Sequence, residues 1–283
     1  MKKTLIALAV AASAMAAGSV AAADWVSGDF NTSIDFGGEI SQPVKGGWEW
    51  LTPAETTAAA SKMDVKADAA VVADGQSTWN NIGNKNLLLL AGKTLTDSTT
   101  GAGMLPVISF GGEGFVMEKP AGDTNIVTLT AKGKSDSSKV GSFKFKLNTY
   151  MLSGIKYTQA SEVIEGAKDS LQLVTAPSNS SWGNGYASNG SHQKAFTGDD
   201  GYALVQAAMG EYFPFISKEG YESMGTGRPN VFNATNASAN GVTAPVKGGY
   251  AAEFVKNSGT LTFPADAIPQ DWVAKMTATV SYM

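Results

Sequence analysis

Residues 24–40 read DWVSGDFNTSIDFGGEI, and the rest of the chain is best interpreted from this stretch outward. From Phe30 to Ile40 every second residue is apolar, small or β-branched, and the residues between them are polar or glycine. Such alternation gives an extended strand one apolar face. An amphipathic strand near a chain end can add itself to the sheet of another molecule. We therefore expect a sandwich that gives such a strand and receives one.

The residues before this stretch have the pattern of a secretion signal. Lys2 and Lys3 precede an apolar run over residues 5–15, and small residues follow from Gly18 to Ala23. A positive start, a short apolar core and an A-x-A-like site predict a signal peptide over residues 1–23, cleaved after residue 22 or 23. No later segment is apolar enough to span a bilayer, so we expect an exported product.

Composition narrows the class of protein. The net charge is −4, and removal of the signal, which carries two basic and no acidic residues, makes it −6. This acidity argues against a nucleic-acid partner. The chain has no cysteine, so disulfides do not stabilise it. Its 32 glycines, with many Thr, Val, Ser and Asn residues, favour short strands joined by turns.

Several segments alternate or are continuously apolar, as the strands of a sandwich do. Residues 104–110 and 115–117 flank a Gly-Gly-Glu-Gly turn and predict a hairpin. Residues 126–130 lead through a turn at 133–136 into a strand over 139–147. The remaining segments with this character are 48–50, 62–67, 87–90, 250–255 and 260–263.

Residues 157–241 have a different pattern. Helical spacing of apolar residues predicts helices over 160–173 and 202–213, with Asp199 or Asp200 as a cap of the second. Polar loops rich in Asn, Ser and Gly occupy 177–198 and 230–241. A long insertion of this kind in a compact domain is usually functional or disordered.

The chain ends on another alternating strand. One face of residues 272–283 carries Met276, Ala278, Val280 and Tyr282, and the other carries Lys, Thr and Ser. From periodicity alone, this could equally be an ordinary last strand of the sandwich.

Together these segments resemble a known family. The signal MKKTLIALAVAASA, the start ADWVSGDFNTSIDFGGEI, the nearby WEW, KVGSFKFKLN and the terminal VAKMTATVSYM resemble chaperone–usher fimbrial subunits, closest to the FaeG/ClpG-type major subunits that double as adhesins. The resemblance is strong over the first 50 and last 35 residues and faint over 160–245. Many pilins carry a glycine about fourteen residues from the end, where this chain has Gln270.

The resemblance implies an all-β fold: an incomplete immunoglobulin-like sandwich that a donated strand completes. Residues 24–36 would be the donor-strand extension and 37–283 a single domain, with a receptor-binding insertion over roughly 157–245. A periplasmic chaperone would lend a strand first, and at the outer-membrane usher the next identical subunit would replace it, giving a homopolymer on the cell surface. The donor residues would be Trp25, Phe30, Thr32 and Ile34, and the groove and chaperone strand would carry Met276, Ala278, Val280 and Tyr282.

Enzymatic function is not expected, and neither is a cofactor or a metal. The only histidine, His192, lies in a polar Asn-Gly-Ser loop that offers no buried carboxylate to hold it. One histidine and no cysteine leave no metal cluster. Gly92-Lys93-Thr94 lacks the first glycine of a phosphate loop, because Leu87 stands there.

Receptor binding is the second function that we expect. Sugar sites combine aromatic rings with amide and carboxylate groups, and the insertion supplies the candidates Trp182, Tyr186, His192, Asp200 and Tyr221 for a host glycan. Alternatively, these aromatic residues pack the insertion onto the sandwich. Two other readings remain: a purely structural shaft subunit, and a free secreted lectin-like sandwich in which residues 24–36 form an edge strand of their own chain.

Overall fold

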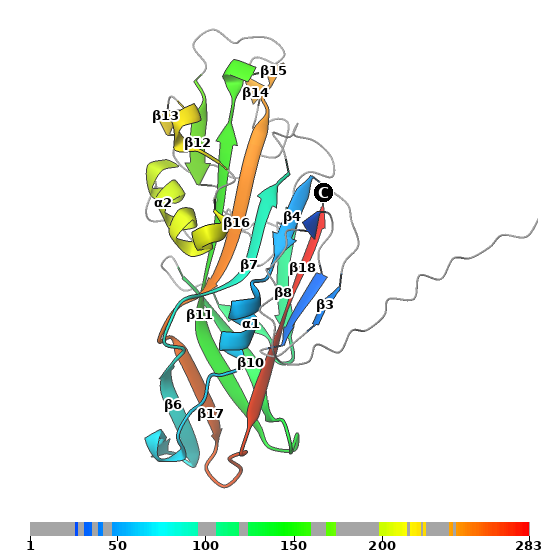
Figure 1. Ribbon diagram of the computed structural model, residues 1–283. Helices are drawn as coiled ribbons and strands as arrows, with labels where there is room; N and C mark the ends of the chain where they lie inside the picture. Colours follow the sequence, from blue (N-terminus) through cyan, green and yellow to red (C-terminus); the bar gives the residue numbers. More distant parts are fainter. Residues whose placement is uncertain are drawn as a thin grey trace, which may run out of the picture.

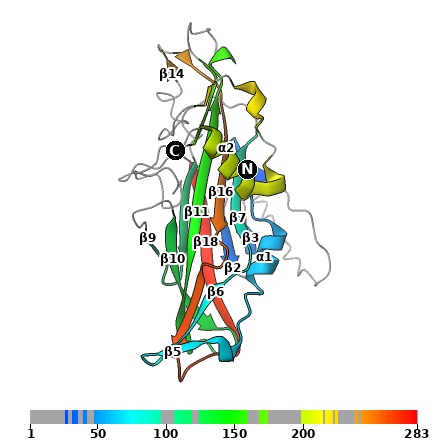
Figure 2. The same cartoon turned by 90° about the vertical axis from the view of Figure 1, so that its left-hand side faces the viewer.

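The computed structural model describes residues 26–27, 31–35, 39–41, 47–95, 106–118, 124–159, 168–173, 198–213, 216–221, 223–224, 238–239 and 242–282. These residues form an elongated antiparallel β structure with two helices on one side (Figures 1 and 2). The predicted all-β sandwich with a helix-containing insertion is confirmed.

The longest strand organises the architecture. β11 (Val140–Ile155) is 16 residues long. Its first half lies between β10 (Asn125–Gly133) and β17 (Gly259–Pro264), and its second half lies between β12 (Ser170–Leu173) and β16 (Val246–Phe254). The β10–β11 hairpin and the alternating Phe143 and Phe145, both buried, are as predicted. Because β11 changes partners along its length, it joins the lower and upper ends of the molecule (Figure 1).

The sheet continues beyond β16 and β17. β7 (Leu87–Thr94) pairs with β16, and β4 (Trp48–Leu51) pairs with β7. At the lower end, β6 (Gln76–Ile82) pairs with β17, and β5 (Val71–Ala73) pairs with β6. β4 is therefore the last strand on this side of the sheet before β1.

The C-terminal strand β18 (Trp272–Tyr282) pairs with β10 near its start and with β8 (Pro106–Gly112) along the rest. β8 does not form the predicted hairpin with β9 (Val116–Glu118), since β9 pairs with β10 instead. Gly112 and Gly114 have φ values of 148° and 61°, and the Thr130 amide donates to the Glu113 carbonyl at 2.8 Å. The glycine turn thus transfers the chain from one neighbour strand to another, and the hairpin prediction is wrong.

The core lies between these strands. Its side chains come from alternate positions of β4, β7, β8, β10, β11, β16, β17 and β18. The largest fully buried side chains are Trp48, Trp50, Tyr250, Phe143, Phe145, Phe254, Phe263 and Leu89. Burial of this much aromatic surface provides the main driving force for folding in a chain without disulfides.

Two helices cover the outer face of the sheet. α1 (Ala54–Ala60), which the sequence analysis did not predict, is tied to β7 by the Thr56 hydroxyl, which donates to the Leu88 carbonyl at 2.9 Å. α2 (Gly198–Met209), which continues as η3 (Gly210–Tyr212), confirms the helix expected over 202–213. It begins four residues earlier than expected, so Asp199 and Asp200 lie inside the helix and the prediction that one of them caps it is wrong. Val205 and Met209 of α2 pack with Leu152, Leu171 and Ala251 in a second buried cluster. The insertion is therefore anchored by a core of its own.

The other predicted helix is wrong at its C-terminal end. Residues 170–173 form β12, where Leu171 pairs with Gly154 of β11, and residues 160–167 lie outside the described part. No helix among the described residues is long and apolar enough to cross a membrane. The remaining elements are short. They are η1 (Ala67–Ala69), η2 (Tyr157–Gln159), η4 (Lys218–Gly220), β13 (Ser223–Met224), β14 (Ser238–Ala239) and β15 (Val242–Thr243). The strand expected over 62–67 is wrong, since residues 62–66 belong to no strand and Ala67 begins η1.

Candidate functional site

The candidate site is the inner face of β18 and the edge of β18 opposite β8. Ala274, Met276, Ala278 and Val280 are buried along this strand, whereas Lys275, Thr279 and Ser281 are exposed. The alternation predicted for the chain end thus appears as a strand with one face in the core. The groove residues expected from the sequence lie together on this face, with Tyr282 half-buried at its end.

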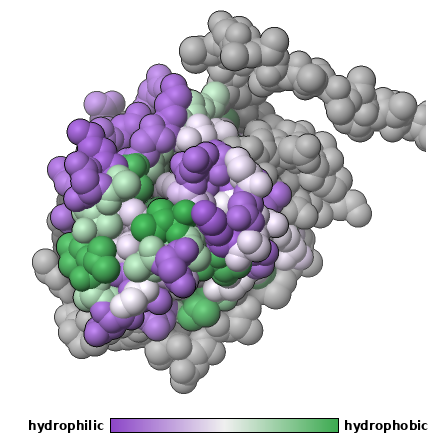
Figure 3. All heavy atoms as spheres, turned by 90° about the horizontal axis from the view of Figure 1, so that it is seen from below, coloured by the Kyte–Doolittle hydropathy of each residue, from purple (hydrophilic) through white to green (hydrophobic). Residues whose placement is uncertain are grey.

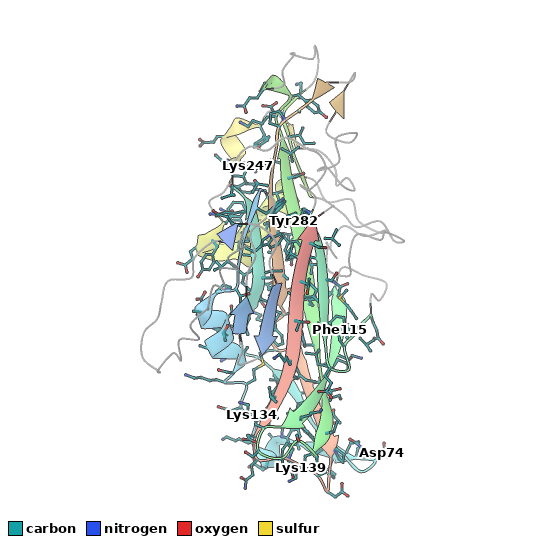
Figure 4. All side chains as sticks on the ribbon, turned by 90° about the vertical axis from the view of Figure 1, so that its right-hand side faces the viewer. Asp74, Phe115, Lys134, Lys139, Lys247 and Tyr282 are labelled. Carbon is teal, nitrogen blue, oxygen red and sulfur yellow. The ribbon has the colours of Figure 1, made fainter. Side chains whose placement is uncertain are left out.

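The edge of β18 opposite β8 is occupied by the N-terminal segment of the same chain. β2 (Asn31–Asp35) runs antiparallel to it, with Ile34 opposite Met276 and Thr32 opposite Ala278. β3 (Glu39–Ser41) pairs back onto β2, so the chain reverses between Asp35 and Glu39. Figure 4 shows these short strands beside β18, whose end is marked by Tyr282.

The residues just before β2 pair with another strand, β4. In β1 (Val26–Ser27), Val26 lies opposite Trp50 and Ser27 opposite Glu49 of β4. The N-terminal segment therefore pairs with β4 through residues 26–27 and with β18 through residues 31–35. The sheet runs from β4 through β7, β16, β11 and β10 to β18, so β1 and β2 are paired to its two end strands.

A direct contact also ties the chain end to β4. The indole Nε1–H of Trp50 donates to the hydroxyl of Tyr282 at 2.7 Å. Trp48 stacks on Trp50 with ring centroids 5.4 Å apart, and Tyr250 lies 5.9 Å from Trp50. Burial raises the pKa of Tyr250 well above its ordinary value, so this ring stays neutral. Buried aromatic rings thus join β4 to the end of β18 and to β16.

Of the four predicted donor residues, the structure describes two. The backbones of Thr32 and Ile34 lie in β2, whereas Trp25 and Phe30 lie outside the described residues. The pairing of Val26 and Ser27 with β4 was missed, because two residues are too few to show a period. The WEW motif at 48–50 was the sequence signal for this pairing, since it places two tryptophans in the strand with which Val26 and Ser27 pair.

The candidate glycan residues are not brought together in the described part of the chain. Trp182, Tyr186 and His192 lie outside it, and Asp200 is placed only as a backbone position in the first turn of α2. Tyr221 is half-buried, with the Lys156 ammonium 5.0 Å from its ring centroid. Its ring also lies where a Cβ on Gly154 would be, against the second cluster. For Tyr221, the structure therefore shows a packing role.

The described residues contain no group of His, Cys, Asp or Glu that could hold a metal. The whole chain, residues 1–283, matches the family of fimbrial major and minor subunits of the K88 type. The chain belongs to this family. It is therefore a subunit of a fimbria, exported to the cell surface, and not an enzyme.

Individual relatives give the same family. K88 fimbrial protein AC of Escherichia coli is 35% identical over 156 residues, which cover 51% of this chain and 52% of that protein. K88 fimbrial protein AD of the same organism is also 35% identical over 156 residues, 51% of each chain. The F41 fimbrial protein of Escherichia coli is 62% identical over 53 residues, 18% of each chain. The chain spans about half the length of the K88 relatives that it matches.

Proposed function

We propose that this chain is a major fimbrial subunit that polymerises by strand donation. Residues 24–36 of one copy take, in the neighbouring copy, the place that β1 and β2 take in their own chain. The observation that carries this proposal is that residues 26–35 pair with both β4 and β18. A terminal segment that closes its own sheet can close that of an identical chain with the same contacts, which is the principle of domain swapping.

The contacts suit such an exchange. Backbone hydrogen bonds to β18 supply affinity that does not depend on sequence, and alternate side chains supply specificity. Thr32 and Ile34 stand opposite Ala278 and Met276, both fully buried, so these two positions lie on the same face of the sheet as the buried residues of β18. Asn31 and Ser33 stand opposite Thr279 and Thr277, which are exposed and half-buried. One face of the donor therefore fills the groove, and the other faces outward.

Two substitutions on opposite faces of the donor test this proposal. Ile34→Asp places a charge toward buried Met276 and is expected to abolish fimbriae on bacteria that assemble them. Ser33→Asp, one residue away and outward-facing, is the matched control and is expected to retain them. Equal amounts of surface fimbriae from both variants would contradict strand donation.

The same groove suits a periplasmic chaperone before assembly. A strand lent by the chaperone would protect the buried face of β18 until the outer-membrane usher brings in the next subunit. Removal of residues 1–23 as a signal peptide would precede both steps, leaving the donor at the free N-terminus. The exposed β18 edge of a subunit without any donor would otherwise invite aggregation.

We also propose that the fimbria binds host glycans through the insertion at 157–245. Two features support this proposal: α2 and the second cluster fix the insertion to a rigid sheet, and rigid scaffolds commonly present binding loops. Trp182, Tyr186, His192 and Asp200 remain the candidates for contacting the sugar. Tyr221 is a weaker candidate, because its ring already packs against the sheet.

A further inference from the structure

A cavity of about 450 Å³ lies in the lower half of the molecule, beside the first residues of β18. One wall is the segment after α1, and another is the connection from β17 to β18. Figure 3 views this end of the molecule, where apolar and hydrophilic side chains are interspersed. Ligand pockets in proteins measure about 300–1,000 Å³, so the cavity is large enough for a small organic ligand.

The buried and exposed parts of the lining differ in character. Every buried residue of the lining is apolar, Trp79 and Phe263 among them. Most of the exposed lining residues are polar: they include Ser61, Asp64, Lys134 and Gln270, and Figure 4 marks Lys134 at this end. A sugar matches such a lining, because it has an apolar face of C–H groups and hydroxyls around its edge.

Hydrogen bonds fix both walls of the cavity. The indole Nε1–H of Trp79 donates to the carbonyl of Lys66 at 2.8 Å, which ties β6 to the segment after α1. In the other wall, the Asp271 carboxylate accepts from the amide of Ser135 at 3.0 Å and from its hydroxyl at 2.8 Å. The cavity is therefore preformed, and a ligand that enters it does not have to order these walls.

Trp272 and Asp271 supply two of the groups that sugar binding requires. The half-buried indole of Trp272 lines the cavity and packs against Phe143, with ring centroids 5.0 Å apart. Hydrogen bonds from the Ser135 amide and hydroxyl lower the pKa of Asp271, so this carboxylate stays charged. Its remaining acceptor sites are available to sugar hydroxyls.

The charges of the lining select the class of sugar. Asp64 and Asp271 carry negative charges and Lys134 carries a positive one, so negative charge is in excess. This excess disfavours phosphate, sulfate and acidic sugars, because like charges repel. A neutral sugar uses the carboxylates as hydrogen-bond acceptors and the ammonium as a donor.

We propose that this cavity binds a neutral hexose, alone or at the end of a longer glycan. The cavity shares no residue with the insertion at 157–245, whose helix α2 lies in the upper half of the molecule (Figure 1). The inference therefore goes beyond the proposed function, and either glycan site can fail without the other. A fibre with such a site on every subunit would bind a glycan-coated surface with high avidity.

The indole N–H signals in the NMR spectrum of the isotope-labelled mature chain report on the two glycan sites separately. Lactose, maltose and cellobiose are the neutral probes, and sialyllactose is the acidic one. The Trp272 signal, assigned with the variant Trp272→Phe, is expected to shift in a saturable way with at least one neutral probe. The signals of Trp48 and Trp50, which do not line the cavity, should stay in place. The Trp182 signal reports on the insertion.

A pair of matched variants tests the polar lining in the same titration. Asp64→Asn removes a charged acceptor and is expected to weaken sugar binding about ten-fold. Asp74→Asn is the control, since Asp74 is exposed at the same end of the molecule but does not line the cavity (Figure 4). Equal dissociation constants for the two variants overturn the proposed recognition.

The remaining outcomes separate the cavity from the insertion. A shift of the Trp182 signal without a shift of the Trp272 signal overturns the cavity site and leaves glycan binding by the insertion intact. A Trp272 signal that no neutral probe shifts, or that only sialyllactose shifts, overturns a site for neutral sugars.

Discussion

The indole Nε1–H of Trp50 donates a hydrogen bond of 2.7 Å to the hydroxyl of Tyr282, joining residues 232 positions apart in the sequence. Trp50 lies on β4 and Tyr282 ends β18, so this hydrogen bond links the two strands with which β1 and β2 pair. It holds the end of the C-terminal strand in place whether the closing strand comes from the same chain or from another. The end of β18, which would accept the donated strand, is therefore held by a contact that does not involve residues 24–36.

Removing the Tyr282 hydroxyl is expected to destabilise the sandwich. Tyr282→Phe leaves the fully buried indole N–H of Trp50 without this acceptor, at a cost of about 1–3 kcal/mol. The free energy of unfolding from urea titration measures the effect. Ser281→Ala, at an exposed position on the same strand, is the control and should stay near the wild-type value. Equal stability of the two variants would show that the hydrogen bond does not contribute.

Glu253 is expected to make stability depend on pH. It is buried on β16, and burial raises the pKa of its carboxyl, although hydrogen bonds from the Asn86 and Asn148 side chains oppose the shift. Because the folded-state pKa lies above the ordinary value of 4.5, stability falls as pH rises from that value through the folded-state pKa. The cost is about 1.4 kcal/mol for each unit of raised pKa.

Glu253→Gln removes this titration. The variant is expected to gain stability relative to the wild type as pH rises from 4.5 through the raised pKa, and to lose that advantage in acid. Urea titrations of both proteins at several pH values measure the difference. A difference that stays constant over the whole range would contradict the assignment.

The anchoring of the insertion can be tested on α2. Val205 is fully buried in the second cluster, and its neighbour Gln206 is exposed. Val205→Ala is expected to cost roughly 1–3 kcal/mol, mostly through the cavity that it leaves. Gln206→Ala, a surface change, should stay within about 0.5 kcal/mol of the wild type. Calorimetric unfolding of the two variants decides, and equal values would mean that α2 does not pack as described.

Two aromatic residues of the insertion are expected to have different roles: Tyr221 in packing and Trp182 in glycan binding. Tyr221→Ala removes a ring that lies against Gly154 and beneath the Lys156 ammonium, so it is expected to lower the melting temperature. Trp182→Ala is expected to reduce binding of fimbriae to a glycan array at an unchanged melting temperature. Both properties are measured on both variants. Retained glycan binding by Trp182→Ala would remove Trp182 from the proposed site.

The strands that the sequence predicted well are those with a long period of two. β10, β11 and β18 alternate over many residues, so their buried faces can be assigned before any partner is known. The partner is harder to predict. The glycine turn at 111–114 has the local chemistry of a hairpin, yet its two flanks pair with β18 and β10. Local turn chemistry does not determine which distant strand satisfies the backbone.

The partners of residues 30–40 were equally hard to predict from the sequence. The alternation of residues 30–40 predicts a strand with an apolar face, but the period extends through Phe36, whereas β2 ends at Asp35 and β3 folds back. The sequence is compatible with two conformations after Asp35. Gly37 and Gly38 permit a chain reversal, whereas the alternation favours continuation of the strand. Leu171 is a simpler case: a four-residue strand is too short for its period to compete with an apparent helical pattern.

The central claim is that the strand at residues 31–35 can be supplied by another molecule. The most direct measurement is the thermal unfolding of mature chain lacking residues 24–35, alone and with a peptide of those residues in increasing concentration. We expect a low melting temperature without peptide and a saturable rise with it, as linkage between binding and folding requires. The same peptide with Ile34→Asp should give little rise. A truncated chain that is equally stable with and without peptide would contradict strand donation.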